Sequence, residues 1–440
     1  MSRINKHFLH FGCWNKGHSY LRDNNNTDIA SNLTNVMRKL NEVCDQIHPD
    51  FIVVAGDNYY PTKQIFKDGD KTKSIKILNE EDLKSGFDSL PKNVEVDVIM
   101  GNHDYETNLY VPENDQFETS CKILKLEYDF EKRQNHNLDV VIHKARKINE
   151  TTLILMIDTT IYDDDYVADI IDCYKIHPDF MIKKPTIENV RQYQSEFIQK
   201  NILGLIDTIE NIIIIGHHPI TGFKLKKGKT KLIDTPGYPF VNMLFNDIFK
   251  FISNIKERNR IKYYYLCADL HQYQIGNINI SPQNNSEETM NIKQYIVGTG
   301  GADLDPYPFD RSSLKENEIK RDHVLLNNSS DMNYMVDYVM TPEQLKLSSS
   351  NYGFLQCSIN EDRLSFKFIN IDGVELIEQT DNQVIDHITS GGKKRKFKTR
   401  KVFKQLKSKS KSGLKKSKTR KTIKKSKRFH KRKQKSKRYK

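Results

Sequence analysis

Short apolar runs alternate with longer amphipathic stretches over roughly the first 380 residues. Runs of this length and composition are typical of buried strands. Nine strands are predicted, at 7–12, 51–55, 96–100, 152–157, 211–215, 263–267, 293–298, 353–359 and 364–370. Apolar residues at helical spacing predict three helices, at 28–47, 186–207 and 240–256. Strands interleaved with helices favour an α/β architecture.

Three stretches do not fit this alternation. Residues 61–90 and 303–350 are expected to be insertions or long loops. The polar stretch 281–290 is expected to interrupt a hairpin. The sequence contains no internal repeat.

Five of the apolar runs end in polar clusters, which read GCWN, GDNYY, GNHDY, GHHP and ADLH. Open α/β sheets bind ligands outside the carboxyl ends of their strands, so these clusters could meet at one site. A single Asp or His after a strand is more often a cap or a hydrogen-bonded surface residue. The ordered set of clusters is harder to attribute to chance, and it favours a shared chemical role.

Imidazole, carboxylate and amide oxygen are suitable ligands for Fe, Mn or Zn. Two such cations about 3.5–4 Å apart can clamp a phosphoryl group and generate hydroxide near neutral pH. Their mutual repulsion requires a bridging anion, which a carboxylate can supply. Glycine at the start of four of the clusters lets the backbone turn sharply and approach the metals.

The motif order GDxxY, GNHD, GHxP and then a His-containing strand end resembles the calcineurin-like metallophosphoesterase family. Tyr60, three residues after Asp57, makes this motif most similar to that of the tartrate-resistant (purple) acid phosphatase branch. Local matches at 153–160, 263–274, 294–306 and 352–359 extend the resemblance over roughly residues 7–380. It implies two packed mixed β-sheets flanked by helices, a four-layer sandwich, in a domain of residues 1–385.

The resemblance also implies a ligand set for two metal ions, which could be Fe, Zn or Mn. Asp57 would bridge the two ions. Tyr60 and His271 would bind the first ion, and Asn102 and His217 would bind the second.

The same resemblance implies which residues meet the substrate, a phosphate ester that a metal-bound hydroxide would attack. His103 would be the catalytic residue beside the phosphate, where it stabilises charge or protonates the leaving oxygen. Asn102 and His218 would contact substrate. For His218, simple packing under Pro219 is the alternative.

Two positions depart from the family pattern. Cys13 stands where the first motif, GDxG, has its metal-binding Asp, and Asp269 replaces the first His of GHxH. A thiolate at Cys13 would favour Zn over ferric iron. The alternative is that Cys13 is a small buried hydrophobe and the first site is weakened, with Asn15 as a less favoured ligand. Asp269 is an acceptable ligand for a hard metal.

Charge is distributed very unevenly along the chain. Residues 391–440 contain 27 of the 70 Lys and Arg residues and no acidic residue, which leaves 43 basic and 57 acidic residues in positions 1–390, a net charge of −14. We expect residues 386–440 to be a disordered basic tail, because such a composition cannot bury a core. The tail could bind nucleic acid or another polyanion, or it could settle against the acidic body.

Six scattered cysteines without a CxxC pair do not suggest a disulfide framework. The N-terminus lacks an apolar core typical of a signal peptide, and no apolar run is long enough for a membrane span. We therefore expect an intracellular protein. A viral or nuclear setting is an additional hypothesis, drawn from the composition of the tail alone.

The favoured function is metal-dependent hydrolysis of phosphate esters, more specifically monoesters. The first alternative is a catalytically degenerate relative that binds polyanions through its tail. A nuclease or phosphodiesterase is a third hypothesis, which Tyr60 and the absence of a D-x-H first motif disfavour.

Overall fold

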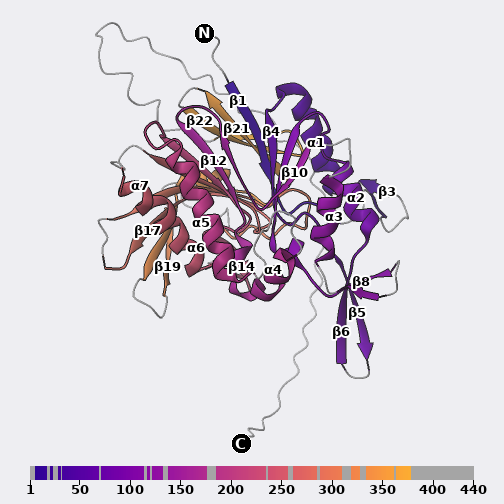
Figure 1. The fold of residues 1–440 in the computed structure, drawn as a ribbon. Helices are drawn as coiled ribbons and strands as arrows, with labels where there is room; N and C mark the ends of the chain where they lie inside the picture. Colours follow the sequence, from indigo (N-terminus) through magenta and orange to yellow (C-terminus); the bar gives the residue numbers. More distant parts are fainter. Residues whose placement is uncertain are drawn as a thin grey trace, which may run out of the picture. The chain divides into compact units, whose positions relative to one another are not determined.

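The computed structural model describes most of residues 5–377 (Figure 1). The description omits residues 17–19, 23–27, 31, 69–70, 113–115, 119–120, 132–136, 176–184, 234–235, 256–260, 285–287, 310–318, 328–332 and 361–362. The basic tail predicted for 386–440 lies outside the described residues, and so does the end of the domain predicted for 1–385.

Two large mixed sheets form the centre of the fold. The strands of the seven-stranded sheet are, in spatial order, β10 (Leu138–Val141), β7 (Glu95–Ile99), β4 (Phe51–Ala55), β1 (Asn5–Phe11), β21 (Gly353–Asn360), β22 (Arg363–Asn370) and β23 (Glu375–Ile377). The first four strands are parallel and the last three run antiparallel. Parallel strands place their carboxyl ends at one edge, so the loops that follow them can form a common site.

The second sheet has eight strands. These are, in spatial order, β11 (His143–Lys147), β12 (Thr152–Ile157), β13 (Asn211–Ile215), β16 (Lys262–Cys267), β18 (Met290–Val297), β17 (Tyr273–Pro282), β20 (Tyr334–Met340) and β19 (Lys320–Leu326). The central strands β12, β13, β16 and β18 are parallel. β12 and β13 are buried along their whole length, which explains their uninterrupted apolar sequences.

The inner faces of the two sheets pack on each other through a shared apolar core, to which Phe8, Val53, Ile154 and Ile213 belong. Helices cover the outer faces (Figure 1). They are α1 (Asn32–Ile47), α2 (Glu80–Asp88), α3 (Lys122–Glu131), α4 (Val167–Tyr174), α5 (Ile187–Leu203), α6 (Tyr238–Met243), a π-helix (Leu244–Lys250), α7 (Phe251–Ser253) and α8 (Pro342–Leu347). The predicted α/β sandwich of packed mixed sheets flanked by helices is confirmed.

Smaller elements complete the described chain. The additional strands are β2 (Tyr20–Arg22), β3 (Asp28–Ala30), β5 (Thr62–Asp68), β6 (Lys71–Ile77), β8 (Leu109–Val111), β9 (Gln116–Glu118), β14 (Gly222–Lys226) and β15 (Lys229–Ile233). The 3-10 turns are η1 (Asn102–Tyr105), η3 (Thr160–Tyr162) and η4 (Asp164–Tyr166).

All nine predicted strands are present, whereas the predicted loops are partly wrong. The stretch 61–90 contains β5, β6 and α2, and 303–350 contains β19, β20 and α8. The helix predicted from residue 28 begins at Asn32, because 28–30 pair with β2 as β3. The stretch 281–290 does connect the antiparallel strands β17 and β18, as predicted.

The scattered cysteines did not suggest a disulfide framework, but the structure contains one disulfide. Cys121 and Cys173 are joined by a disulfide, with Cα atoms 5.4 Å apart and a sequence separation of 52. Helices α3 and α4 both pack on η1, which brings the two cysteines together. Disulfides persist mainly in oxidising environments, so this pair does not support the intracellular location expected from the sequence.

No helix in the described part of the chain is both long enough and apolar enough to cross a membrane.

Candidate metal centre

The loops after five strands bring the motif residues together at the carboxyl ends of the parallel strands. The loop after β1 is tied to the loop after β4 by a bond of 3.1 Å from the Cys13 N–H to the Gly56 carbonyl. In the other sheet, the Ala268 N–H donates to the His217 carbonyl at 2.8 Å. The two sheets therefore contribute facing rims to one site.

Three of the motif residues have a backbone conformation that L-residues rarely adopt. Cys13 and Asp57 have φ of 53°, and Asp269 has φ of 54°. Each such residue costs roughly 1–2 kcal/mol, and strain of this kind concentrates at functional sites. Gly56 makes the close approach possible, since a Cβ there would lie 2.6 Å from Nδ1 of His217.

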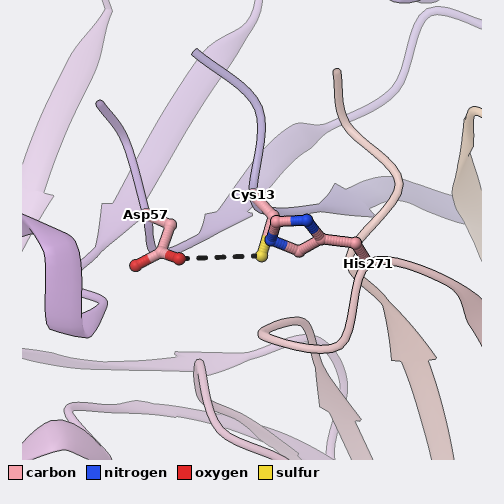
Figure 2. Close-up of side chains that lie close together, drawn as sticks. All are labelled: Cys13, Asp57 and His271. Atoms are coloured by element: carbon pink, nitrogen blue, oxygen red, sulfur yellow. Dashed lines mark hydrogen bonds between the residues drawn. The ribbon is translucent and has the colours of Figure 1, made fainter. Parts of the chain in front are cut away.

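The first cluster contains Cys13, Asp57 and His271, whose ligand atoms all lie within 4.8 Å of one another (Figure 2). The Cys13 sulfur lies 3.9 Å from Oδ2 of Asp57. The Tyr60 hydroxyl donates to the same oxygen at 2.8 Å and lies 3.1 Å from Nε2 of His271. Nδ1 of His271 is 2.5 Å from the Asp303 carbonyl, which can only accept. Nε2 therefore presents its lone pair to the cluster.

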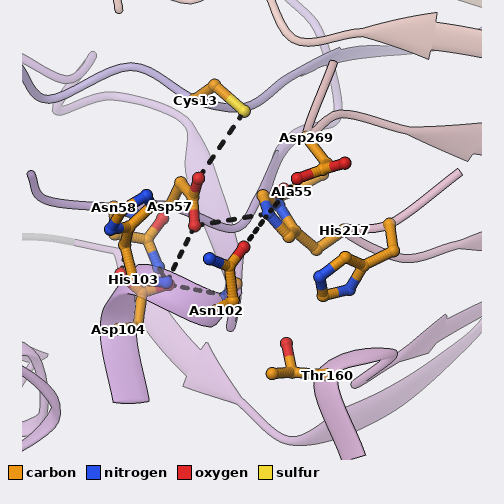
Figure 3. Close-up of polar contacts among 12 residues, drawn as sticks. Cys13, Ala55, Asp57, Asn58, Asn102, His103, Asp104, Thr160, His217 and Asp269 are labelled. Atoms are coloured by element: carbon orange, nitrogen blue, oxygen red, sulfur yellow. Dashed lines mark hydrogen bonds and ion pairs between the residues drawn. The ribbon is translucent and has the colours of Figure 1, made fainter. Parts of the chain in front are cut away.

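The second cluster surrounds Nε2 of His217 (Figure 3). Nδ1 of this ring donates to the Ala55 carbonyl at 2.8 Å, which leaves Nε2 to face the cluster. Nε2 lies 3.2 Å from Oδ1 of Asn102, 3.2 Å from Oδ1 of Asp57 and 4.0 Å from Oδ1 of Asp269. A carboxylate, an amide oxygen and an imidazole nitrogen that converge in a buried place are suited to binding a cation. The donor types fit a transition metal.

The surroundings hold the ligands in these orientations. The Asn102 amide donates from Nδ2 to the Tyr166 hydroxyl at 3.1 Å, which turns Oδ1 towards His217. The Thr159 hydroxyl accepts the backbone N–H groups of His217 and His218 and lies 3.1 Å from Nδ1 of His218. His218 is therefore buried beside the second cluster with its Nδ1 already bonded.

Two groups of the first cluster have shifted pKa values. Burial, reinforced by the negative charge of Asp57, raises the pKa of the Cys13 thiol well above its ordinary value. Burial opposes ionisation of Asp57, but His217 and His103 lower the pKa of that carboxyl to about 2. Cys13 would consequently bind a metal only by releasing its proton to solvent.

His103 lies at the edge of both clusters. Its backbone N–H donates to Oδ1 of Asp57 at 3.1 Å, and its Nδ1 lies 2.5 Å from Oε1 of Glu106, which also binds Lys76 at 2.7 Å. Burial alone would lower the pKa of His103, but Asp57 and Glu106 raise it to about 9. The ring packs against Tyr60, with centroids 4.6 Å apart. A protonated imidazole is thus held beside the candidate metal ligands.

Several supporting residues were not assigned from the sequence: Asp104, Glu106, Thr159, Thr160 and Tyr166. Asp104 joins two motif loops by accepting from the Asn58 N–H at 2.8 Å and the Gly101 N–H at 2.7 Å. Thr160 is buried, and its hydroxyl has no hydrogen-bond partner among the described residues (Figure 3). Asp104 belongs to the motif GNHD, and Thr159 and Thr160 belong to the matched stretch 153–160. The sequence could therefore have indicated all three residues.

Comparisons with known proteins identify the family of the chain. The family model for calcineurin-like phosphoesterases matches residues 6–273. No match to the chain is found among curated proteins. Among solved structures, GAP50, the anchor in the inner membrane complex of Plasmodium, is similar at 10% identity and a TM-score of 0.42, over 86% of this chain and 90% of that one. That likeness is too weak to support a statement about fold or function. Because the family model covers more than half of its length, the chain belongs to the calcineurin-like phosphoesterase family.

Proposed function

We propose that the protein hydrolyses phosphate esters, most favourably monoesters, at a binuclear metal centre similar to that of purple acid phosphatases. One observation carries the proposal, namely that the two carboxylate oxygens of Asp57 face different ligand clusters. Oδ2 meets Cys13 and Tyr60, and Oδ1 lies 3.2 Å from Nε2 of His217. A carboxylate in this position suits a bridge between two cations.

In this proposal the first ion is held by Cys13, Asp57, Tyr60 and His271, and the second by Asp57, Asn102, His217 and Asp269. Two metal ions supply the positive charge that clamps the phosphoryl group and lowers the pKa of water. Fe, Zn and Mn remain the candidates. The sulfur of Cys13 favours Zn at the first site, and the oxygen of Asp269 suits a harder ion at the second.

Other side chains would act directly on the substrate. His103, protonated and fixed by Glu106, can stabilise the phosphate charge or give its proton to the leaving oxygen. In this proposal the Thr160 hydroxyl and the His218 ring would orient the phosphate from the side of the second cluster. These groups make the site suitable for acid-assisted cleavage of a phosphate ester.

A catalytically degenerate phosphoesterase that binds polyanions is the second candidate. The raised pKa of the Cys13 thiol favours it, because the first site must lose a buried proton before it can hold a cation. In that case the wild-type protein would retain one metal ion or none.

The Asp57→Asn variant tests the proposal. Loss of the bridging charge should remove metal and nearly all hydrolysis of an aryl phosphate together, as seen by elemental analysis and a colorimetric assay. Asp247→Asn is the matched control, since Asp247 lies in the π-helix and bonds to Ser195 at 2.5 Å. Full activity in Asp57→Asn would contradict a binuclear centre. Wild-type protein that binds one metal tightly and hydrolyses nothing would support the degenerate alternative.

A further inference from the structure

The hairpin that directly follows the GHHP motif carries an unusual concentration of positive charge. Strands β14 and β15 span residues 222–233, which contain five lysines and no acidic residue, within a body whose net charge is −14. The two turn residues, Lys227 and Gly228, have φ of 53° and 71°, as a two-residue type I′ turn requires.

The register places four of the lysines on one face of this ribbon. Lys224 lies opposite Lys231, and Lys226 lies opposite Lys229. Cross-strand partners and residues two apart in a strand point to the same side, so these four side chains form one surface, here named the lysine face. Like charges placed directly opposite each other destabilise a hairpin. The arrangement thus concentrates positive charge on one surface of the hairpin.

The opposite face of the ribbon fixes its orientation. Phe223 is buried and packs on Phe309, with ring centroids 5.2 Å apart, and on Tyr338. Leu232 packs against the core. The lysine face therefore points away from the protein body, and Lys226, Lys229 and Lys231 are exposed.

The lysine face begins at the rim of the metal centre. Among the described residues, Lys224 is the one member of the lysine face that forms an ion pair. Its Nζ lies 3.1 Å from Oδ2 of Asp305. Asp305 in turn accepts the backbone N–H of His271 at 3.1 Å through the same oxygen. A substrate whose reacting phosphate lies beside His271 would thus extend towards these lysines.

A second lysine pair lies near His103. In the β5–β6 hairpin Lys63 is opposite Lys76, and Lys76 contacts the Glu106 carboxylate that holds His103. Positive charge therefore borders the candidate centre on the sides of both His103 and His271.

We propose that the lysine face binds the non-reacting phosphate groups of a multiply phosphorylated small-molecule substrate, an inference that rests on the proposed phosphoesterase function. Lysine ammonium groups bind phosphate as compact point charges. Single-stranded nucleic acid is disfavoured as the occupant, because its bases need exposed aromatic rings on which to stack. The one aromatic ring of the hairpin, Phe223, is buried.

The test uses the full chain and inorganic tripolyphosphate as the probe. Acetylation of lysines, followed by mass spectrometry, reports each residue separately, so binding by the basic tail does not obscure the result. Tripolyphosphate should protect Lys226, Lys229 and Lys231. In the triple variant Lys226→Gln/Lys229→Gln/Lys231→Gln, the inhibition constant of tripolyphosphate against aryl phosphate hydrolysis should rise by about tenfold. The kcat and KM for the aryl phosphate should stay within about twofold of the wild-type values.

The matched control replaces Lys92, Lys147 and Lys200 by glutamine, since these exposed lysines lie towards the amino ends of the parallel strands. Its inhibition constant should equal that of the wild type. Absence of protection, or equal inhibition constants in all three proteins, would overturn the proposal. Stronger protection by a thymidine oligonucleotide at equal phosphate concentration would overturn it in favour of nucleic acid. Failure of the phosphoesterase function alone would abolish hydrolysis but leave the protection in place.

Discussion

Cys13 combines a φ of 53° with a buried sulfur 3.9 Å from Asp57, a geometry that costs conformational energy and aims the thiol at the candidate ligands. If the sulfur binds metal, Cys13→Ser should lower the affinity of the first site at least about tenfold. Cys13→Asp should restore the carboxylate typical of the family and favour Fe or Mn. Metal titrations followed by elemental analysis measure both effects.

Cys267→Ser is the control for this experiment, because Cys267 is also buried but its sulfur lies 3.6 Å from the Tyr295 carbonyl, away from the ligands. It should change stability without changing metal stoichiometry. If Cys13→Ser behaves in the same way, Cys13 is a packing residue.

His10, buried in β1, gives a prediction about pH. Its Nε2 donates to the Cys267 carbonyl at 3.4 Å, and burial lowers its pKa to about 3 despite this bond. The unfolded chain would protonate this ring near pH 6.5, so between about pH 6.5 and 3 the unfolded state binds more protons. The free energy of unfolding should therefore fall by up to about 1.4 kcal/mol per pH unit on acidification.

Denaturant unfolding from pH 7 to pH 4 measures this dependence. His10→Gln keeps a donor for the carbonyl but does not titrate, so its stability should fall less steeply than that of the wild type. His323→Gln, at an exposed position of β19, should follow the wild-type curve. Parallel curves for wild type and His10→Gln would contradict the argument.

The residues of the centre differ in how far the sequence could identify them. Asp57, Asn102, His217 and His271 directly follow strands or open turns, where the motif spacing is visible. Glu106 and Tyr166 could not be assigned, because each acts by orienting another side chain, Glu106 on His103 and Tyr166 on Asn102. Such contacts depend on the packing of η1 and η4, which a local pattern does not encode.

Among the elements, the disulfide offers the clearest test. Cys121 and Cys173 close a loop of 52 residues, and loop closure of that size can contribute up to about 4 kcal/mol of stability. Dithiothreitol should therefore shift guanidinium unfolding to lower concentration. In Cys121→Ala/Cys173→Ala the reductant should have no further effect. A wild-type curve that does not respond to reductant would show that the pair is not bonded in solution.

The strands were predictable to the extent that they are buried. β4 and β13 match their predicted bounds because a continuous apolar run is needed on both faces. Hairpins β5–β6 and β14–β15 were missed, since their lysine-rich sequences resemble loops and their pairing depends on tight turns. The distance in sequence between α3 and α4 likewise hid the disulfide.

At the scale of the whole molecule, the dominant feature is the separation of charge between an acidic body and a cationic tail. Residues 1–390 carry a net charge of −14, and 391–440 contain 27 Lys and Arg. If the tail binds polyanions, as its composition suggests, that binding would release counterions and should weaken steeply with salt. All strands of the two sheets and all the candidate ligands named above lie within residues 5–377.

Removal of residues 391–440 should therefore separate two properties. Hydrolysis of an aryl phosphate and the unfolding transition should stay unchanged, because the ligands and the core lie elsewhere. Affinity for a duplex DNA at low salt should fall by at least about a hundredfold, with a shallower dependence on salt, since fewer phosphates are neutralised.

The control is the full chain with Lys226→Gln/Lys229→Gln/Lys231→Gln. It should retain most of the DNA affinity, because only three of its 70 basic residues are lost. Equal affinity and equal salt dependence with and without the tail would place DNA binding on the body instead.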